Sequence, residues 1–416
     1  MKKGQSFFVI ILVLIILGTM YIALDNIFPL VINMFQDTSL FYNYNINKYS
    51  TTEASDTKEK IIAYEYEQRL NKIFPYNNLD ANVYYTIYGK RVLETDDFLD
   101  LSDVTIDDNL EKNLELLTNI KVVNLYNQNL SKEEKIKLIE KFPNIEFKWK
   151  VDILGEEIEY NIETLDFSNR TITDINDFKK SLVLLTNLKK LDLSNSNLTN
   201  EELGALREEF PNIKIDWVVH MSKWSVRTDA VAFSVLVYKY DYRRMTTEDI
   251  QVLKYCTDLQ ALDLGHQAIE DISVIGEYLP NLRVLILADN KIKDISPLAN
   301  LKHLHYLELF MNDITDSSPL ASCTELVDLN ISFNYRFSDI SGIMNLPKLE
   351  RLWLISDRIS AESYNLIRQT YPNVKLVTTG SGSTNSGWRT HERYYTMIDM
   401  YKNNYISDVF LKYDNE

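Results

Sequence analysis

Cysteine, proline, glycine and basic charge are all scarce in this sequence of 416 residues. Two Cys are too few for a disulfide scaffold or a Cys-rich zinc site. With 11 Gly and 9 Pro, the chain is neither collagen-like nor of low complexity. Lys and Arg number 44 against 60 Asp and Glu, a formal net charge of −16. Because a nucleic-acid partner requires a basic face, this balance argues against nucleic-acid binding.

An uncharged apolar run stands out against this acidic background. Phe7–Leu24 has 18 residues without a charge, and as a helix it would span roughly 27 Å, close to the ~30 Å hydrocarbon core of a bilayer. Lys2 and Lys3 precede it, and the next basic residue is Lys48. This asymmetry predicts a transmembrane anchor within residues 1–25, with the N-terminus inside the cell and the body of the protein extracellular.

A cleaved secretory signal is the competing interpretation of the same run, and it would leave the protein secreted. A signal normally has a shorter apolar core that ends in a small-x-small site, whereas bulky Tyr21 stands two positions before Ala23. Both interpretations place the body outside the membrane. Residues 26–56 lack apolar periodicity and are predicted to be a spacer.

Sequence repeats dominate residues 246–377. The pattern L-x-x-L-x-L, followed by a polar residue and then Ile, recurs with a spacing of roughly 22 to 23 residues, which is a typical period for a leucine-rich repeat. In each copy the alternating Leu pair, such as Leu285 and Leu287, is expected to point inward from a short strand. The copies begin at Leu259, Leu282, Leu304, Leu326 and Leu349.

An asparagine follows the strand in the central copies. Asn290, Asn312 and Asn334 stand where the chain leaves the strand, and an inward amide there can both donate to and accept from neighbouring backbone groups. Gln267 and Asp357 occupy this position in the outer copies, where we expect fewer of the neighbouring backbone groups to be hydrogen-bonded. Ser-Pro-Leu sequences then predict corners on the far side, because proline fixes φ.

A longer repeat, with a period of about 68 residues, covers residues 57–245. Leu116–Trp149 aligns with Leu184–Trp217 without a gap, and just over half of the aligned positions are identical. Each unit has a Leu-rich strand, a helix start at Ser131 or Thr199, and an amphipathic helix closed by Phe-Pro-Asn. A helix over residues 57–74 is predicted as a degenerate first copy that caps the array. The stretch 218–244 breaks the rhythm, and its strands are not predicted.

The segment Asn290–Asn300 (N-K-I-K-D-I-S-P-L-A-N) closely resembles the internalin-type repeat of Gram-positive surface proteins. The resemblance covers residues 246–377 well and 90–217 more loosely. It implies an α/β leucine-rich-repeat solenoid, with a parallel sheet on the concave face and helices and turns on the convex face, here behind an N-terminal transmembrane helix. It also implies a protein ligand on the concave face and no catalytic residues.

The concave face is formed by the alternate strand residues that do not point into the core. Large aromatic side chains with an Arg on such a face have the composition of an interaction hot spot. The alternative is that a neighbouring loop or the C-terminal tail covers them. The predicted binding residues are Ile286, Tyr306, Glu308, Phe310, Arg351, Trp353 and Ile355.

The remaining reactive side chains predict no enzyme, metal site or cofactor. Cys256 and Cys323 occupy equivalent positions three repeats apart, roughly 14 Å by strand stacking, which is too far for a disulfide. We therefore expect both to be buried core residues. His303 and His305 flank Leu304 without a third zinc ligand nearby, and they are predicted to be polar surface residues.

The C-terminal end has two parts. Residues 378–387, including Gly380–Gly387 (GSGSTNSG), have the composition of a flexible linker. Within the tail 388–416, an apolar helical stripe is formed by Tyr394, Met397, Ile398 and Tyr401. The stripe predicts either a short helix that folds back as a cap or a docking segment for another protein.

Together these patterns predict a membrane-anchored extracellular module that binds a protein or peptide through its concave face. The alternative function is a structural scaffold or sensor component of the cell envelope, which acts in cis through its C-terminal tail. Exposure separates the two: if Tyr306, Phe310 and Trp353 lie under residues 388–410, the concave-binding prediction loses its motive.

Overall fold

The computed structural model describes residues 84–235 and 244–412. The chain divides into two compact units, Met1–Asn82 and Val83–Glu416, and the described residues belong to the second. Within them, no helix is long and apolar enough to cross a bilayer. The predicted anchor Phe7–Leu24, the spacer 26–56 and the helix 57–74 lie outside the described residues.

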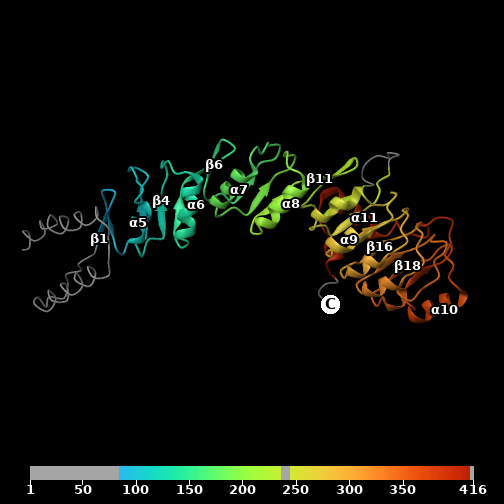
Figure 1. Cartoon of the computed structure of the whole chain (residues 1–416). Coiled ribbons are helices and arrows are strands. Elements are labelled where there is room, and N and C mark those ends of the chain that lie inside the picture. Colours follow the sequence, from blue (N-terminus) through green and yellow to red (C-terminus); the bar gives the residue numbers. More distant parts are fainter. Residues whose placement is uncertain (1–83, 236–243, 413–416) are drawn as a thin grey trace, which may run out of the picture. The chain divides into compact units, whose positions relative to one another are not determined.

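Short parallel strands form three separate sheets (Figure 1). In the largest sheet the Leu residues of the repeat stand in register, as in Leu285, Leu307 and Leu329. The first sheet holds β3 (Phe98–Asp100), β4 (Val122–Asn124) and β5 (Glu146–Lys148), and the second holds β8 (Thr164–Asp166), β9 (Lys190–Asp192) and β10 (Lys214–Asp216). The third holds β13 (Ala232–Ser234), β14 (Ala261–Asp263), β15 (Val284–Ile286), β16 (Tyr306–Glu308), β17 (Asp328–Asn330), β18 (Arg351–Trp353) and β19 (Lys375–Val377).

Within each of the three parallel sheets, helices return the chain from one strand to the next. Ser131 and Thr199 each form a complete capping box, with Glu134 and Glu202 respectively, as the sequence predicts. The Ser-Pro-Leu sequences begin 3₁₀ helices with Pro in the first turn. These elements are α5 (Leu110–Glu115), α6 (Lys132–Lys141), α7 (Ile175–Leu184), α8 (Asn200–Glu209), η1 (Asp249–Tyr255), α9 (Ser273–Tyr278), η2 (Ser296–Asn300), η3 (Ser318–Ser322), η4 (Ile343–Asn345) and α10 (Ala361–Thr370).

Antiparallel hairpins separate the three sheets, a feature that the repeat pattern does not predict. They are β1 (Tyr84–Ile87) with β2 (Lys90–Leu93), β6 (Lys150–Ile153) with β7 (Glu156–Glu159), and β11 (Val218–Met221) with β12 (Trp224–Arg227). The second and third hairpins occupy equivalent positions in successive long units, so the hairpin is part of the long repeat. Gly89 and Gly155 have φ of +80° and +82°, which a tight hairpin turn requires. The stretch 218–244 thus contributes β11, β12 and β13.

A continuous apolar core runs behind the sheets from Ile87 to Ile367. Cys256 and Cys323 lie in it as free, fully buried thiols, which confirms their predicted role as core residues. Burial raises the pKa of each thiol to about 12. Neither thiol is therefore ionised near neutral pH, and neither is activated for redox chemistry.

The three predicted asparagines, Asn290, Asn312 and Asn334, form a row of hydrogen bonds along the edge of the third sheet, called here the asparagine ladder. Asn312 Nδ2 donates to the carbonyls of Leu287 (2.9 Å) and Leu309 (3.0 Å), and its Oδ1 accepts from Ile292 N (3.0 Å). Asn290 and Asn334 make equivalent bonds one repeat away on either side. Each amide therefore satisfies three buried backbone groups, and its removal would leave those groups unpaired.

Asp357 occupies the last position of the asparagine ladder and makes fewer hydrogen bonds to the backbone than the asparagines do, as the sequence suggests. Its Oδ1 accepts from Asn334 N at 3.0 Å, but its buried Oδ2 has no hydrogen-bond partner among the described residues. A carboxylate cannot donate to the carbonyls that the asparagines bind. Burial raises the pKa of this carboxyl to about 8.

The raised pKa of Asp357 predicts a pH-dependent stability. Between the ordinary pKa of the unfolded chain, about 4, and about 8, the folded state binds a proton that the unfolded state has lost. The free energy of unfolding therefore falls as pH rises through this interval. Asp357→Asn removes this contribution, so we expect it to raise the melting temperature more at pH 8.5 than at pH 5. An equal effect at both pH values, or an equal response from the control variant of exposed Asp313, Asp313→Asn, would contradict this origin.

Candidate functional site: the covered concave face

The predicted binding residues are buried, not exposed. Tyr306, Glu308 and Trp353 have no exposed surface, and Ile286, Phe310, Arg351 and Ile355 retain at most 4%. The apolar residues among them belong to a second apolar cluster, on the opposite side of the strands from the Leu core. The expectation of a solvent-exposed aromatic face is therefore wrong, and the alternative of a covering segment is correct.

Residues 380–411, called here the covering segment, lie over this face. They contain α11 (Glu392–Asn403) and η5 (Asp408–Phe410), and α11 packs on β13 and β14 (Figure 1). His391 caps the helix by accepting from Arg393 N, and Asn404 ends it in the left-handed conformation. The predicted helix is thus present and folds back on its own array.

The buried stripe of α11 is slightly rotated from the predicted one. Met397 and Tyr401 are buried as expected, but Met400 takes the buried position expected of Ile398, which stays half-buried like Tyr394. Met397, Met400 and Phe410 join the cluster formed by Ile286, Tyr306 and Phe310. The apolar side chains of the face and of the segment therefore form one core.

Trp388 is the aromatic centre of the contact. Its fully buried ring lies 5.2 Å from the Tyr306 ring and 5.0 Å from the Trp353 ring, between centroids. Its Nε1 donates to Glu308 Oε1 at 2.7 Å. A buried indole N–H needs such an acceptor, so Glu308 fixes the orientation of the ring as well as its position.

Two arginines of the covering segment meet three carboxylates of the repeats. Arg389 donates to Glu308 Oε2 at 2.7 Å. Arg393 Nη2 donates to Asp328 Oδ1 at 3.1 Å and to Glu350 Oε2 at 2.6 Å. Glu308, Asp328 and Glu350 are called here the acidic trio. Glu308 and Asp328 have no exposed surface, and buried charges of this kind persist only when they are paired.

Arg351 is the repeat array's own counter-charge in this site. Its Nε and Nη2 both donate to Asp328 at 2.7 Å, the two-pronged geometry in which Arg binds a carboxylate best. Its Nη1 donates to the carbonyl of Trp388 at 3.2 Å. Arg351 therefore holds Asp328 in place and also binds the backbone of the covering segment.

Burial shifts the pKa of two further groups on this face. Burial raises the pKa of Asp263 to about 6, against the opposing effect of hydrogen bonds from Gly265 N and Ser234. Burial, reinforced by Glu308, raises the pKa of the Tyr306 hydroxyl well above its usual value. With a pKa of about 6, Asp263 remains mostly ionised at pH 7, whereas the Tyr306 hydroxyl stays protonated.

Residues 380–387 do not hang free as a flexible linker would. Trp353 Nε1 donates to the carbonyl of Asn385 at 2.9 Å, and Asn330 Nδ2 donates to that of Ser383 at 2.9 Å. Lys375 Nζ donates to the carbonyl of Ser386 at 3.0 Å. Side chains of β17 to β19 thus bind the backbone of this stretch, which composition alone could not reveal.

The other end of the covering segment is attached at the first strand of the sheet. Asn404 Oδ1 accepts from Val231 N at 2.9 Å and from Ala232 N at 3.2 Å. Arg283 Nη1 donates to the carbonyl of Phe410 at 3.3 Å. The segment is therefore bound from β13 to β19, along the full width of the sheet.

Trp388, Arg389 and Arg393 are the residues that the sequence analysis missed. A usable signal was present: two arginines four positions apart follow a Trp, and the concave strands carry acids among aromatics. Opposite charges and matching apolar composition on two parts of one chain indicate that the parts dock on each other.

The histidines of the described residues do not form a metal site. Among residues 84–235 and 244–412, no group of three or more potential metal ligands is present. His303 is exposed, but His305 is 1% exposed, so its predicted surface position is wrong. His266 Nδ1 lies 2.9 Å from Asp289 Oδ2.

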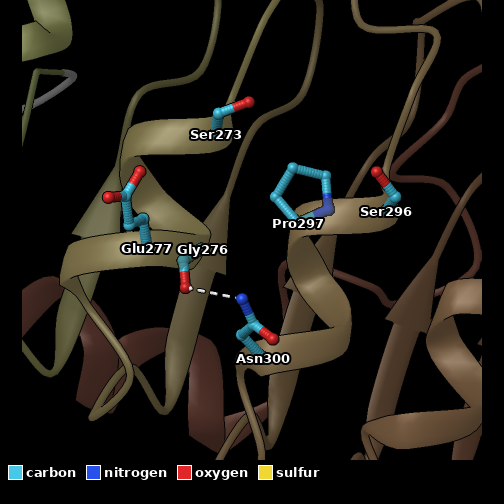
Figure 2. A pocket seen from close by; sticks show the side chains of 6 residues that line it. All are labelled: Ser273, Gly276, Glu277, Ser296, Pro297 and Asn300. Carbon is cyan, nitrogen blue, oxygen red and sulfur yellow. Dashed lines mark hydrogen bonds between the residues drawn. The ribbon is translucent and has the colours of Figure 1, made fainter.

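A hollow of about 360 Å³ on the convex side lies between α9 and η2 (Figure 2). Inside it, Asn300 Nδ2 donates to the carbonyl of Gly276 at 3.2 Å. The only charged group in its lining is the carboxylate of Glu277, and the lining contains no His, Cys or Lys. We therefore propose no active site there. The lining residues are Ser273, Gly276, Glu277, Ser296, Pro297 and Asn300.

Comparison with known proteins supports the repeat assignment. A family model described as leucine-rich repeats (2 copies) matches residues 280–322. No curated protein matches the chain significantly. The crystal structure of internalin C2 from Listeria monocytogenes is 25% identical, with 55% of this chain and 86% of that chain covered and a TM-score of 0.29.

Two further solved structures are similar at this level. An internalin F from Listeria monocytogenes is 22% identical, with 73% and 89% covered and a TM-score of 0.34. A leucine-rich-repeat protein of Leptospira interrogans is 19% identical, with 64% and 74% covered and a TM-score of 0.32. Because all three TM-scores are low, the fold assignment rests on the match over 280–322 and on the strand register. The leucine-rich repeat predicted from the sequence is thus confirmed.

Proposed function

We propose that this protein is a leucine-rich-repeat interaction module, held at a membrane by Phe7–Leu24 with its body extracellular, that binds a peptide segment on the concave face of its third sheet. The proposal includes no enzymatic activity. The anchor rests on the apolar run and its flanking lysines. A mature N-terminus that begins after Leu24, read by mass spectrometry, would overturn it.

Because the tail covers Tyr306, Phe310 and Trp353, an exposed aromatic face no longer supports the binding proposal. The proposal is supported instead by the observation that this face already holds a peptide, the covering segment. Side chains from neighbouring repeats bind its backbone carbonyls, as Asn330 of β17 and Trp353 of β18 do at Ser383 and Asn385. Carbonyl contacts of this kind fix the course of a peptide without regard to its sequence. The acidic trio and the aromatic pair Tyr306 and Trp353 add side-chain specificity. The face therefore has the chemistry of a peptide-binding site.

A direct test displaces the covering segment from the face by substitution and then measures whether the same segment binds as a separate peptide. Full-length Arg389→Glu/Arg393→Glu places carboxylates against the acidic trio, so its own segment should leave the face. A fluorescently labelled synthetic peptide of residues 384–412 should then bind this variant with at least about ten-fold higher affinity than it binds the wild type, whose face is occupied. Fluorescence anisotropy measures both affinities.

The matched control is the same peptide with Glu at both arginine positions, which should bind the variant no better than background. Adding Trp353→Ala to the variant should also weaken binding, because it removes both the stacking on Trp388 and the bond to Asn385. If the variant is folded by circular dichroism but binds both peptides equally, the face is not a peptide-binding site.

The second candidate function is a scaffold or sensor component that acts in cis through its tail. Complete burial of Tyr306, Trp353 and Trp388 favours it, because a permanently covered face serves the stability of the array and does not receive partners. The two candidates differ in whether the wild-type face ever opens. If the labelled peptide slowly displaces the covering segment and binds the wild type, the binding module is supported. If the peptide never binds the wild type, the scaffold is supported.

A further inference from the structure

The first part of the covering segment, together with the two residues before it, contributes nothing to either apolar core. Residues 378–387 contain Gly380, Gly382 and Gly387, and none of their side chains belongs to the two clusters. Their attachment consists of backbone carbonyls bound by Asn330, Trp353 and Lys375. Extending this stretch would break these three hydrogen bonds but would remove no side chain from either apolar core.

The face and the segment beyond this stretch are each strongly apolar when apart. Opening would expose Tyr306, Phe310 and Trp353 on one side and Trp388 and Met397 on the other. It would also leave Glu308 and Asp328 facing an apolar surface without Arg389 and Arg393. Large exposed apolar surfaces of this kind favour association with another molecule. The same segment from a second copy of the chain would reproduce every contact made by residues 388–411.

We infer that residues 388–411 are exchangeable between two copies of this chain, so that the segment of one copy covers the concave face of the other. The interface in the exchanged pair is the one already present within a single copy, and the stretches 378–387 are the hinges. Such an exchange creates a dimer at little cost, since it forms no new type of contact. The inference rests on the proposed function insofar as the face must bind the segment as a separate peptide.

The concentration of the protein sets the balance between the closed monomer, whose segment covers its own face, and the exchanged dimer. A short link gives the segment an effective concentration on the order of 1 mM at its own face. The closed form therefore predominates in dilute solution, and exchange grows as the local concentration of chains approaches that value. The proposed membrane anchor would concentrate copies in this way, with their segments on the same side of the bilayer.

Two full-length variants with different affinity tags test the exchange in detergent. One carries Arg389→Glu/Arg393→Glu in its segment, and the other carries Glu308→Gln/Asp328→Asn in its face. The arginine segment of the second variant suits the acidic face of the first, whereas the acidic segment of the first suits the neutral face of the second. We expect at least about ten-fold more co-purification between the two variants than within either one.

Wild-type protein provides a second measurement that needs no substitution. Refolding from denaturant at about 5 μM and at about 500 μM, followed by size-exclusion chromatography with light scattering, should give a larger dimer fraction at the higher concentration. An equal dimer fraction at both concentrations, or no preferential pairing of the two variants, would overturn the exchange. If the synthetic peptide 384–412 nevertheless binds the emptied face, the proposed function stands and only the exchange fails.

Discussion

Trp388→Ala is expected to release the covering segment and to accelerate its cleavage by trypsin about 100-fold. The ring is fully buried between Tyr306 and Trp353 and donates to Glu308. Removing a buried Trp costs about 3–5 kcal/mol. If cleavage after Arg393 and Lys402 requires local opening, about 3 kcal/mol corresponds to a rate increase of about two orders of magnitude.

The matched control for this prediction is Tyr395→Ala on the same segment. Tyr395 is 60% exposed, so its loss should change the cleavage rate by less than about two-fold. Cleavage is followed by mass spectrometry, which distinguishes cuts in the segment from cuts in the repeats. If both variants are cleaved as slowly as the wild type, Trp388 does not hold the segment on the face.

The repeat pattern predicted what is local and periodic. Inward Leu pairs, the asparagine ladder and the capping boxes at Ser131 and Thr199 follow from contacts within one repeat or with its immediate neighbour. Side-chain alternation tells which face of a strand a residue occupies. It does not tell what covers that face.

The covering segment could not be derived from periodicity, because its contacts join residues far apart in the chain. Trp388 and Glu308 are 80 residues apart. The burial of Tyr306 and Trp353 under the tail was therefore predicted only as the alternative to an exposed binding face. The burial of His305 was missed for a related reason: flanking positions at a strand entry carry no periodic signal that separates inside from outside.

The hairpins between the sheets were missed although the sequence contained a signal for them. Lys150–Ile153 and Glu156–Glu159 alternate in polarity around Leu154 and Gly155, which is the pattern of a two-stranded ribbon with a tight turn. The same arrangement recurs in the next long unit, as β11 and β12. One long unit is thus a hairpin followed by three parallel strands, and this explains why the long period does not divide into regular copies of the short repeat.

The acidic composition has a specific structural correlate at the concave face. Glu308 and Asp328 are buried and depend on Arg351, Arg389 and Arg393 for their counter-charges. Any replacement for the covering segment must supply equivalent cations, since an unpaired buried carboxylate is strongly destabilising. If the face binds peptides as proposed, we therefore expect it to reject acidic peptides and to favour segments that carry arginines next to a large aromatic residue.

Gly342→Ala is expected to destabilise the repeat array by about 3 kcal/mol or more. A Cβ at this position would lie 1.7 Å from the carbonyl oxygen of Ser317 and 2.5 Å from its carbonyl carbon. These are backbone atoms of the preceding repeat. Ser317 is also tied down, because its Oγ accepts from Gly342 N at 3.1 Å and donates to the carbonyl of Asp339 at 2.8 Å.

The clash cannot be relieved by a side-chain rotation, so the two turns must move apart and strain the strands that they connect. For an array of this size we expect the melting temperature to fall by about 6 °C or more, measured by circular dichroism. The matched control is Gly380→Ala, whose Cβ would meet the terminal methyl group of Ile355 at 3.1 Å. That methyl can shift, so the control should melt close to the wild type. If Gly342→Ala also melts close to the wild type, neighbouring convex turns do not pack backbone to backbone at Ser317, and the close stacking of repeats in this region is wrong.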